Sequence, residues 1–290
     1  MAVRPMAVAD AFYEADPGRC EKAIRACIGE YAPPERLGRV LGGVVPHAGW
    51  VYSGATAAKV FVTLRKHAKP ETFVVFGAVH QWGVTRLTVD AHSAWATPFG
   101  DAAVDDELAE AIVAEAGDEI ARSARAHLGE HSIEVQVPFI KHLFPEAKIL
   151  PIAVPPTGGA IAAGEHVARA VRKLSRAAAI ISSTDLTHYG MHYRDFEHGR
   201  LPAALPWVKS NDRRMLELIE RLDAEAIMPE AAGNANACGS GAVAAGISAA
   251  REMGATEAVL LEYATSADVL GPAAADSAVG YAALVFCGSP

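Results

Sequence analysis

Short apolar runs alternate along the chain with longer amphipathic segments, and this alternation most restricts the fold. The runs Val40–Val45, Thr72–Phe76 and Ala178–Ser183 are largely apolar on both faces, as expected of strands buried between two layers of helices. A repeated order of buried strand and amphipathic helix is typical of a parallel sheet covered on both sides. We therefore predict an α/β fold with a mostly parallel central sheet.

The remaining segments continue this order to the end of the chain. Further strands are expected at Arg86–Val89, Lys148–Val154, Ala258–Ala264 and Val279–Phe286, and helices at Gly54–Lys66, Asp105–Glu115, Ser132–Phe144, Ile161–Arg176, Asn211–Arg221, Asp223–Ala231 and Gly239–Met253. No internal repeat, low-complexity segment or linker interrupts them. We therefore expect residues 1–290 to form a single domain.

The charge pattern argues against two classes of partner. The net charge is −8, from 26 basic and 34 acidic residues spread along the sequence. No stripe of Lys and Arg stands out, so we expect neither nucleic-acid binding nor docking on an anionic membrane. The longest uncharged run, Ala231–Ala250, is too weakly hydrophobic to span a bilayer.

The four cysteines do not suggest a disulfide scaffold. Cys20 and Cys27 are seven residues apart, which in a helix separates their backbones by roughly 10 Å, too far for a disulfide. The first residues contain acids and prolines where a signal peptide needs an apolar core. We expect a cytoplasmic protein with reduced thiols, which are then available for metals or redox chemistry.

Histidines follow three of the predicted strands at the point where each strand ends. His47 lies in VVPHAGWVYSG, His80 in FVVFGAVH, and Asp185 and His188 in IISSTDLTHYG. In open α/β sheets the loops at the carboxyl ends of the strands converge on one crevice, where ligands bind. We therefore expect these side chains to share a site.

Imidazoles that converge from separate strands suit a divalent transition metal, which needs a third, anionic ligand. The sequence offers Asp185, Glu130 or Cys238 for that role. Cys238 lies in NANACGSGA ahead of a predicted helix, whose N-terminus would lower the pKa of the thiol. The same pattern also fits a small buried side chain without a chemical role.

The segment GEHSIEVQVPF places Glu130 and His131 at the start of a predicted helix, where backbone donors favour an anion. Glu134 is interpreted as an ordinary exposed acid. The other histidines are expected at the surface or at helix caps: His67, His92, His127, His142, His166, His192 and His198. The sequence has no G-x-S-x-G motif and no glycine-rich phosphate loop, so neither an esterase triad nor a nucleotide site is supported.

Taken together and in order, the motifs resemble the Memo-like family. They are PHAGWVYSG, GAVH, EHSIEVQVPF, SSTDLTHYG, NACGSG and the closing YATSADV and DSAVGYAAL, and they extend from about Val45 to Leu284. The family includes the protein B component of the AmmeMemoRadiSam system and the mediator of cell motility. Its fold is similar to that of class III extradiol dioxygenases, so the resemblance implies an α/β/α sandwich of the kind that holds non-haem iron in those enzymes.

The resemblance also implies roles for particular residues. His47, His80 and Cys238 match the family's metal-ligand positions, where Cys replaces the carboxylate of the dioxygenases. His188 resembles the catalytic acid/base histidine of the dioxygenases, and Asp185 belongs to the same motif. Because a thiolate is a soft ligand, we expect Fe(II) first, then copper, then zinc.

A substrate pocket is expected beside this centre. Its expected lining is Trp50, Tyr52, Trp82, Glu130, His131 and Tyr189. GAVHQWG stands where many relatives have a proline–serine pair before the histidine, and Trp82 would reshape the mouth of the pocket. We expect the ligand to be a small molecule or a peptide.

The function expected from the resemblance is a metal-dependent oxidoreductase of the Memo type, acting on an unidentified substrate. One alternative is a non-catalytic module that binds phosphopeptides or proteins in the same pocket. Another is an extradiol ring-cleaving dioxygenase, and a zinc hydrolase is a minor one. An oxidisable thiolate in place of a carboxylate argues against ring cleavage. The predicted helices around Asn211–Ala231 could also serve as the surface of a homo-oligomer.

Overall fold

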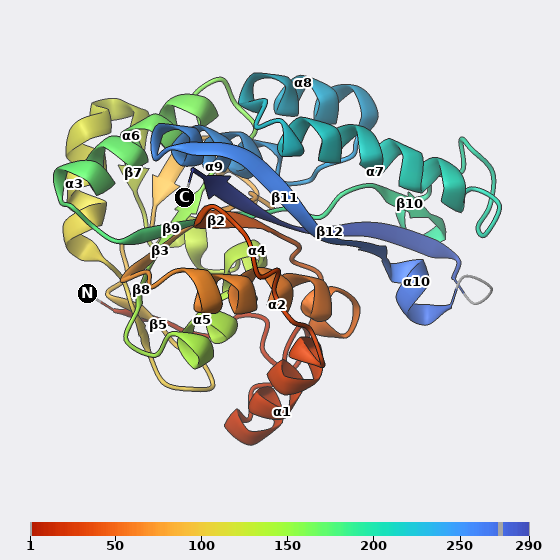
Figure 1. Ribbon diagram of the computed structural model, residues 1–290, viewed down its shortest axis with the longest axis horizontal. Helices are drawn as coiled ribbons and strands as arrows, with labels where there is room; N and C mark the ends of the chain where they lie inside the picture. Colours follow the sequence, from red (N-terminus) through yellow and green to blue (C-terminus); the bar gives the residue numbers. More distant parts are fainter. Residues whose placement is uncertain (1, 272–274, 290) are drawn as a thin grey trace.

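The structure, a computed structural model, describes residues 2–271 and 275–289, and its centre is a mixed sheet covered by helices on both faces (Figure 1). The sheet order is β10-β12-β2-β9-β3-β8-β4-β7, and β11 pairs with β12 beside this path. Its strands are β2 (Arg39–Val45), β3 (Thr72–Gly77), β4 (Leu87–Val89), β7 (Ile120–Arg122), β8 (Lys148–Ala153), β9 (Ala178–Ser183), β10 (His188–Gly190), β11 (Ala255–Thr265) and β12 (Ser277–Gly288). The predicted α/β sandwich is confirmed.

The four central strands, β2, β9, β3 and β8, are parallel to one another. They are the apolar runs of the sequence, and almost all of their side chains are buried. Antiparallel pairing begins on either side of them, where β12 meets β2 and β4 meets β8. The carboxyl ends of the parallel strands therefore point to one edge of the sheet, as a shared site requires.

Helices form a layer on each face of the sheet. The helices are α1 (Pro17–Ile28), α2 (Trp50–His67), α3 (Asp106–Ala116), α4 (His131–Glu134), α5 (Val137–Leu143), α6 (Ala160–Lys173), α7 (Leu205–Glu220), α8 (Ala224–Asn234), α9 (Ser240–Glu252) and α10 (Ser266–Leu270). On one face α2 packs on β2 and β12, with α1 and α5 against it. On the other face α9 packs on β9 and β3, with α6 and α8 against it (Figure 1).

Several helices differ from the sequence prediction in their bounds; α7, for example, begins at Leu205, six residues before the expected Asn211. The expected helix Ser132–Phe144 is broken into α4 and α5, because Pro138 has no N–H to donate to the carbonyl of Glu134. The helix expected from Gly54 begins four residues earlier, at Trp50. A second, small sheet of β1 (Val3–Arg4), β5 (Ala94–Trp95) and β6 (Ala102–Ala103) was not predicted, because its strands have only two residues each.

Helix α9 lies unusually close to its neighbours because of two glycines. A Cβ atom on Gly246 would lie 1.7 Å from Ser182 Oγ on β9. A Cβ atom on Gly164 of α6 would lie 2.2 Å from the carbonyl oxygen of Ala245 on α9. The small side chains of the uncharged run thus allow a buried helix that packs closely on both β9 and α6.

The N-terminal segment is fixed to the rest of the chain by a buried ion pair. Arg4 Nη1 lies 2.7 Å from Glu134 Oε2, and both side chains are almost fully buried. Arg4 also donates to the carbonyl oxygens of His127 and Glu130, while Glu134 Oε1 accepts from the hydroxyl of Tyr13. The interpretation of Glu134 as an exposed acid is therefore wrong, because its partners come from the distant N-terminus.

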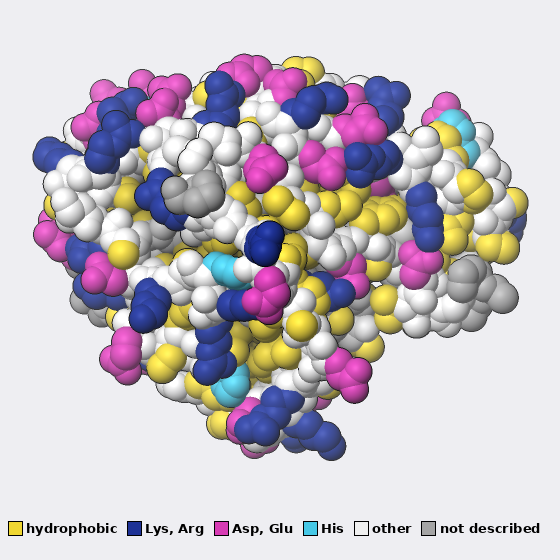
Figure 2. All heavy atoms as spheres, in the orientation of Figure 1, with side chains coloured by type: hydrophobic (Ala, Val, Ile, Leu, Met, Phe, Trp, Pro, Cys, Tyr) yellow, Lys and Arg dark blue, Asp and Glu magenta, His cyan; other side chains and the backbone are white. Residues whose placement is uncertain are grey.

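The surface charges and the helix lengths can be compared with the expectations about membranes and nucleic acids. Basic and acidic side chains are interspersed over the face shown in Figure 2. In the part of the chain that the structure describes, no helix is both long and apolar enough to cross a bilayer.

His92 and His127 are buried, contrary to prediction. His92 Nδ1 lies 2.8 Å from Asp90 Oδ1, and His127 Nε2 lies 3.0 Å from the carbonyl oxygen of Thr88.

Replacing Arg4 by Met should destabilise the protein by about 3–5 kcal/mol, because Glu134 would remain buried without its cation. Urea denaturation followed by circular dichroism measures this change. The double variant Arg4→Met/Glu134→Gln should lose less than the single variant, since it removes both charges. A single variant as stable as the wild type would contradict the importance of this pair.

Candidate metal centre

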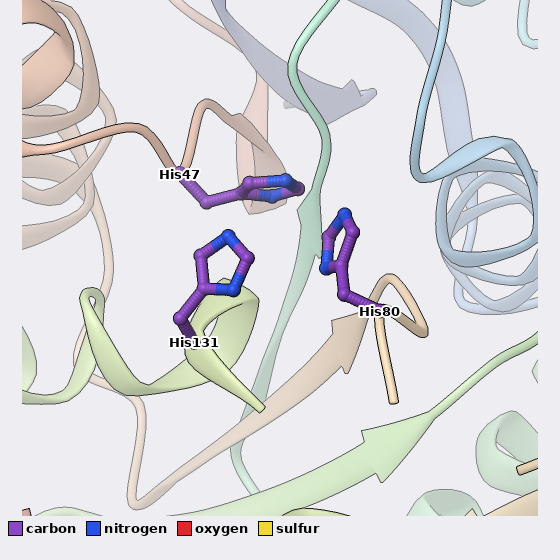
Figure 3. A group of neighbouring side chains, drawn as sticks. All are labelled: His47, His80 and His131. Atoms are coloured by element: carbon purple, nitrogen blue, oxygen red, sulfur yellow. The ribbon is translucent and has the colours of Figure 1, made fainter. Parts of the chain in front are cut away.

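Three histidines converge at the carboxyl edge of the sheet (Figure 3). His47 follows β2, His80 follows β3, and His131 is the first residue of α4. One ring nitrogen from each lies within 4.8 Å of those from the other two, so the three could hold a metal ion. The sequence placed His131 in the pocket, and the structure adds it to the group that can bind a metal.

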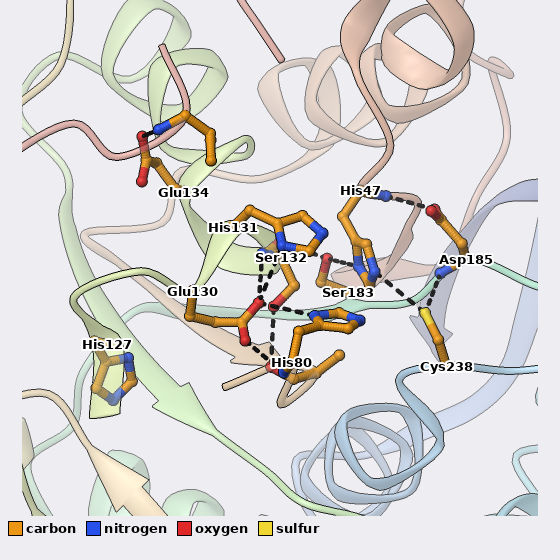
Figure 4. Close-up of polar contacts among 12 residues, drawn as sticks. His47, His80, His127, Glu130, His131, Ser132, Glu134, Ser183, Asp185 and Cys238 are labelled. Carbon is orange, nitrogen blue, oxygen red and sulfur yellow. Dashed lines mark hydrogen bonds and ion pairs between the residues drawn. The ribbon is translucent and has the colours of Figure 1, made fainter. Parts of the chain in front are cut away.

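The His80 ring is oriented by Glu130. Glu130 Oε1 lies 3.0 Å from His80 Nδ1, and Oε2 accepts from the backbone N–H of His80 at 2.7 Å (Figure 4). Glu130 also caps α4 by accepting from Ser132 N. Although burial opposes its ionisation, the hydrogen bonds from His80 hold the pKa of Glu130 at about 2. An ionised carboxylate only accepts, so Nδ1 is a donor, and in the neutral ring the lone pair is on Nε2.

The His47 ring is oriented by a chain of hydrogen bonds. Ser183 Oγ donates to the carbonyl oxygen of Ser132 at 2.7 Å, so it accepts from His47 Nδ1, 3.0 Å away. This leaves the lone pair on Nε2, which lies 3.2 Å from Cys238 Sγ. Burial and the neighbouring His80 and His131 hold the pKa of His47 well below its usual value, so the ring is neutral at pH 7.

Asp185 joins the loops that carry His47 and Cys238. Its Oδ1 accepts from the backbone N–H of His47 at 2.7 Å. Its own backbone N–H lies 3.3 Å from Cys238 Sγ, and its carbonyl oxygen accepts from Cys238 N at 3.2 Å. Burial raises the pKa of Asp185 to about 7. The side chain thus binds the His47 loop, and the structure shows no contact in which it orients His188 among the described residues.

The expected lowering of the Cys238 pKa is wrong. Burial, with the nearby Asp185, raises the pKa of the thiol to about 12. Cys238 precedes Gly239, the N-cap of α9, so it lies near the helix N-terminus as predicted. The loss of hydration outweighs the favourable field of the helix, and the group is a neutral thiol until a metal or another cation lies beside it.

His188 lines the same cavity as His131 and Asp185. Its Nδ1 lies 2.9 Å from the carbonyl oxygen of Leu186, so Nδ1 carries the proton and Nε2 can accept. Burial lowers the pKa of His188, which keeps the ring neutral at pH 7. Its ring packs edge-on against Tyr193, with centroids 4.9 Å apart.

The turn between Asp185 and His188 is held from behind by α7. Asp212 Oδ1 accepts from the backbone N–H of Thr187 at 2.8 Å, and Oδ2 accepts from the hydroxyl of Tyr263 at 2.7 Å. Asn211 Nδ2 donates to Thr187 Oγ1 at 3.0 Å. Burial raises the pKa of Asp212 to about 6. None of these supports was identified from the sequence, because they depend on how α7 packs.

A cavity of about 550 Å³ opens beside the histidines, and its walls include His131, Asp185 and His188. Three tyrosines, Tyr52, Tyr193 and Tyr281, also line it, as does the exposed His192. Tyr193 and Tyr281 had no role in the sequence prediction, and His192 was expected at the surface or at a helix cap. Their segments are brought beside the histidines by the pairing of β10 with β12 and of β12 with β2, which the motifs do not reveal.

The other residues expected in the pocket lie elsewhere. Trp50 is buried and lines a neighbouring cavity instead, and its Nε1 donates to the carbonyl oxygen of Val135. Tyr189 is buried and donates to the carbonyl oxygen of Gly199. Glu130 lies behind His80, and Trp82 is fully exposed to solvent, outside the cavity.

Comparison with known proteins agrees with the motifs. A sequence model of the family described as Memo-like protein matches residues 4–285. The chain belongs to the Memo-like family. This Memo-like chain is 39% identical, over 291 residues, to a MEMO1 family protein of Methanothermobacter thermautotrophicus, with 97% of the chain and 99% of the relative aligned. It is 36% identical to one of Methanopyrus kandleri (98% of each aligned) and 34% identical to one of Pyrobaculum aerophilum (99% of each aligned).

Replacing Asp212 by Asn should change how stability depends on pH. A folded-state pKa raised from 3.8 to about 6 means that the folded protein binds the proton more tightly than the unfolded chain. This contribution to stability is present below about pH 4 and is lost as the pH rises through 6, by at most about 1.4 kcal/mol per pH unit.

Urea denaturation of metal-free protein at pH 4, 5, 6 and 7 measures the effect. Asp212→Asn should remove this part of the slope, in addition to a constant loss from the weakened bond to Tyr263. Parallel pH profiles for the wild type and the variant would contradict the assignment.

Proposed function

We propose that this Memo-like chain is a metal-dependent oxidoreductase that holds iron or copper through His47, His80 and Cys238. The observation that supports this most directly is the convergence of the His47, His80 and His131 rings, with Cys238 Sγ 3.2 Å from His47 Nε2. His47 and His80 each hold Nδ1 in a hydrogen bond and keep the lone pair on Nε2. Metal-binding histidines are oriented in this way by partners behind them.

The donor set fits iron or copper better than a hard cation. Three imidazoles and one thiol are nitrogen and sulfur donors, which favour late first-row metals over magnesium or calcium. When bound, iron or copper would supply electron transfer to or from a substrate in the adjoining cavity. His131 lies at the wall of that cavity and is available as a further ligand.

The chain's own residues supply proton transfer and positioning. His188 is neutral and has an acceptor at Nε2, so it can take a proton from a hydroxyl of a substrate in the cavity. Asp185 holds the His47 loop next to the Cys238 loop by its contacts to both backbones. Tyr52, Tyr193 and Tyr281 provide aromatic walls and hydroxyl groups for orienting a ligand.

The cavity gives less support to the alternative of a phosphopeptide module. Its described lining contains no Lys or Arg, whereas phosphate groups are usually recognised by Arg or Lys. Two carboxylates, Asp185 and Asp276, lie there instead. The absence of a cationic side chain from the described walls favours a ligand without phosphate.

The proposal is tested by metal analysis of protein purified without added metal. Wild type should contain iron or copper at close to one ion per chain, with a charge-transfer absorption that depends on a thiolate. Cys238→Ser should abolish that band and most of the metal. The matched control is Cys27→Ser, which removes another partly buried thiol and should leave both unchanged.

The variant His131→Gln tests whether the metal is held by His47, His80 and Cys238 alone or by His131 as well. Loss of metal equal to that of Cys238→Ser would show that His131 is also a ligand, whereas retained metal would leave the two-histidine, one-cysteine set. Reduction by ascorbate and reoxidation by air, followed by electron paramagnetic resonance, tests redox activity. Protein that takes up no iron or copper, or only zinc that Cys238→Ser does not affect, would overturn the proposal.

Replacing Glu130 by Gln should weaken metal binding about 10–100-fold, because the group that orients His80 loses its charge. Competition with a chromogenic chelator measures the affinity. Glu146→Gln, an exposed position on the loop after α5, is the control for loss of one negative charge. Equal affinities in the two variants would remove Glu130 from the metal site.

A further inference from the structure

A second cavity, of about 490 Å³, adjoins the cavity of about 550 Å³ beside the candidate metal centre. The larger of the two is called the metal cavity from here on. Phe12 and Tyr52 line both cavities. The neighbouring residues Val269 and Leu270 at the end of α10 each line one of them. The second cavity, here called the side pocket, therefore continues the metal cavity toward α1.

The walls of the side pocket are largely apolar. They come from α1 and from the first turns of α2, and include Ala23, Ala26, Cys27, Val51 and Ala55. Volumes near 500 Å³ with mostly apolar walls are usual for sites of small molecules.

Exposed apolar side chains gather around the two cavities. The described part of the chain has ten large hydrophobic side chains that are exposed, and five of them line one cavity or both: Val51, Tyr52, Tyr193, Val269 and Leu270. Val51 is 75% exposed although it lies in the first turn of a long helix. Such a concentration of exposed apolar surface marks a place where a ligand or partner is bound.

The charges around the side pocket limit the ligand. Among the described residues that line it there is no Lys or Arg, and the acids are Asp10 and Glu14. Both acids face Arg19, with Glu14 Oε2 2.7 Å from Arg19 Nε and Asp10 Oδ1 3.6 Å from Nη2. The side pocket therefore offers no cation to a carboxylate or phosphate and suits an uncharged group.

We propose that the side pocket binds the apolar tail of the substrate while a polar head lies between His131 and His188. The substrate class is then an uncharged amphiphile, for which an alkyl-substituted phenol is a simple representative. This inference rests on the proposed function for the location of the head, and on the side pocket alone for the tail.

The test is isothermal titration calorimetry with phenol, 4-ethylphenol, 4-butylphenol and 4-hexylphenol. Each methylene that enters the side pocket should lower Kd by up to about four-fold, so affinity should rise steadily with chain length. No gain with chain length in the wild type would overturn the proposal.

Ala55→Trp places an indole in the side pocket from an exposed position of α2, so the core is not overpacked. In this variant the ratio of Kd for phenol to Kd for 4-hexylphenol should fall close to one. Ala114→Trp, at an exposed position of α3 away from both cavities, is the matched control and should keep the wild-type ratio. Circular dichroism reports whether each variant is folded.

Three further outcomes would overturn the proposal. One is a chain-length gain that persists in Ala55→Trp, which would place the tail elsewhere. Another is tighter binding of 4-butylphenyl phosphate than of 4-butylphenol. The third is a wild-type dimer in sedimentation velocity that Ala55→Trp dissociates, because the apolar surface would then be covered by a second copy of the chain.

The metal analysis and the chain-length titrations test different claims, so either one can fail without the other. A chain-length gain in protein that takes up no iron or copper would leave the side pocket as a binding site and remove the proposed redox function. A redox-active metal centre without a chain-length gain would leave the function and remove the amphiphile.

Discussion

The position of the site depends on Asp185, a buried carboxylate at the end of β9. It accepts from the backbone N–H of His47 and exchanges backbone contacts with Cys238. Three segments far apart in the sequence, the loops after β2 and β9 and the loop before α9, are thereby held at fixed distances. Glu130 has the same role on the other side, where it binds both the backbone and the ring of His80. His47 and His80 are thus positioned by contacts to their main chains and to Nδ1 of their rings, which leaves Nε2 of each ring for a ligand.

Asp185 and Glu130 can hold the site residues in place only if the segments that carry these two carboxylates are themselves rigid. The Arg4–Glu134 pair ties the N-terminal segment to α4, the helix that Glu130 caps. Gly246 and Gly164 allow α9, which follows Cys238, to pack directly on β9 and α6. Asp212 fixes the turn that carries His188. The candidate metal centre is therefore supported on several sides by buried polar contacts and close helix packing rather than by long flexible loops.

The sequence predicted what depends on local pattern. Apolar runs located the four parallel strands, and the rule for strand ends brought His47, His80 and Asp185 to one edge. It could not predict that Glu134 is buried, since Arg4 is 130 residues away along the chain. Nor could it predict the Cys238 pKa, because the helix N-terminus is visible in the sequence and the degree of burial is not. Tyr193 and Tyr281 reach the cavity through strand pairing that no motif encodes.

The contact between Cys238 and the neutral His47 ring has a consequence for how easily air oxidises the protein. With a pKa near 12 the sulfur is held as a thiol, and oxidants attack the thiolate. The folded chain without a metal thus keeps Cys238 in the form that oxidants attack least. If the proposed metal displaced that proton, the same sulfur would become vulnerable to oxidation. Under the proposed function, the thiol form would therefore protect this sulfur until the metal binds.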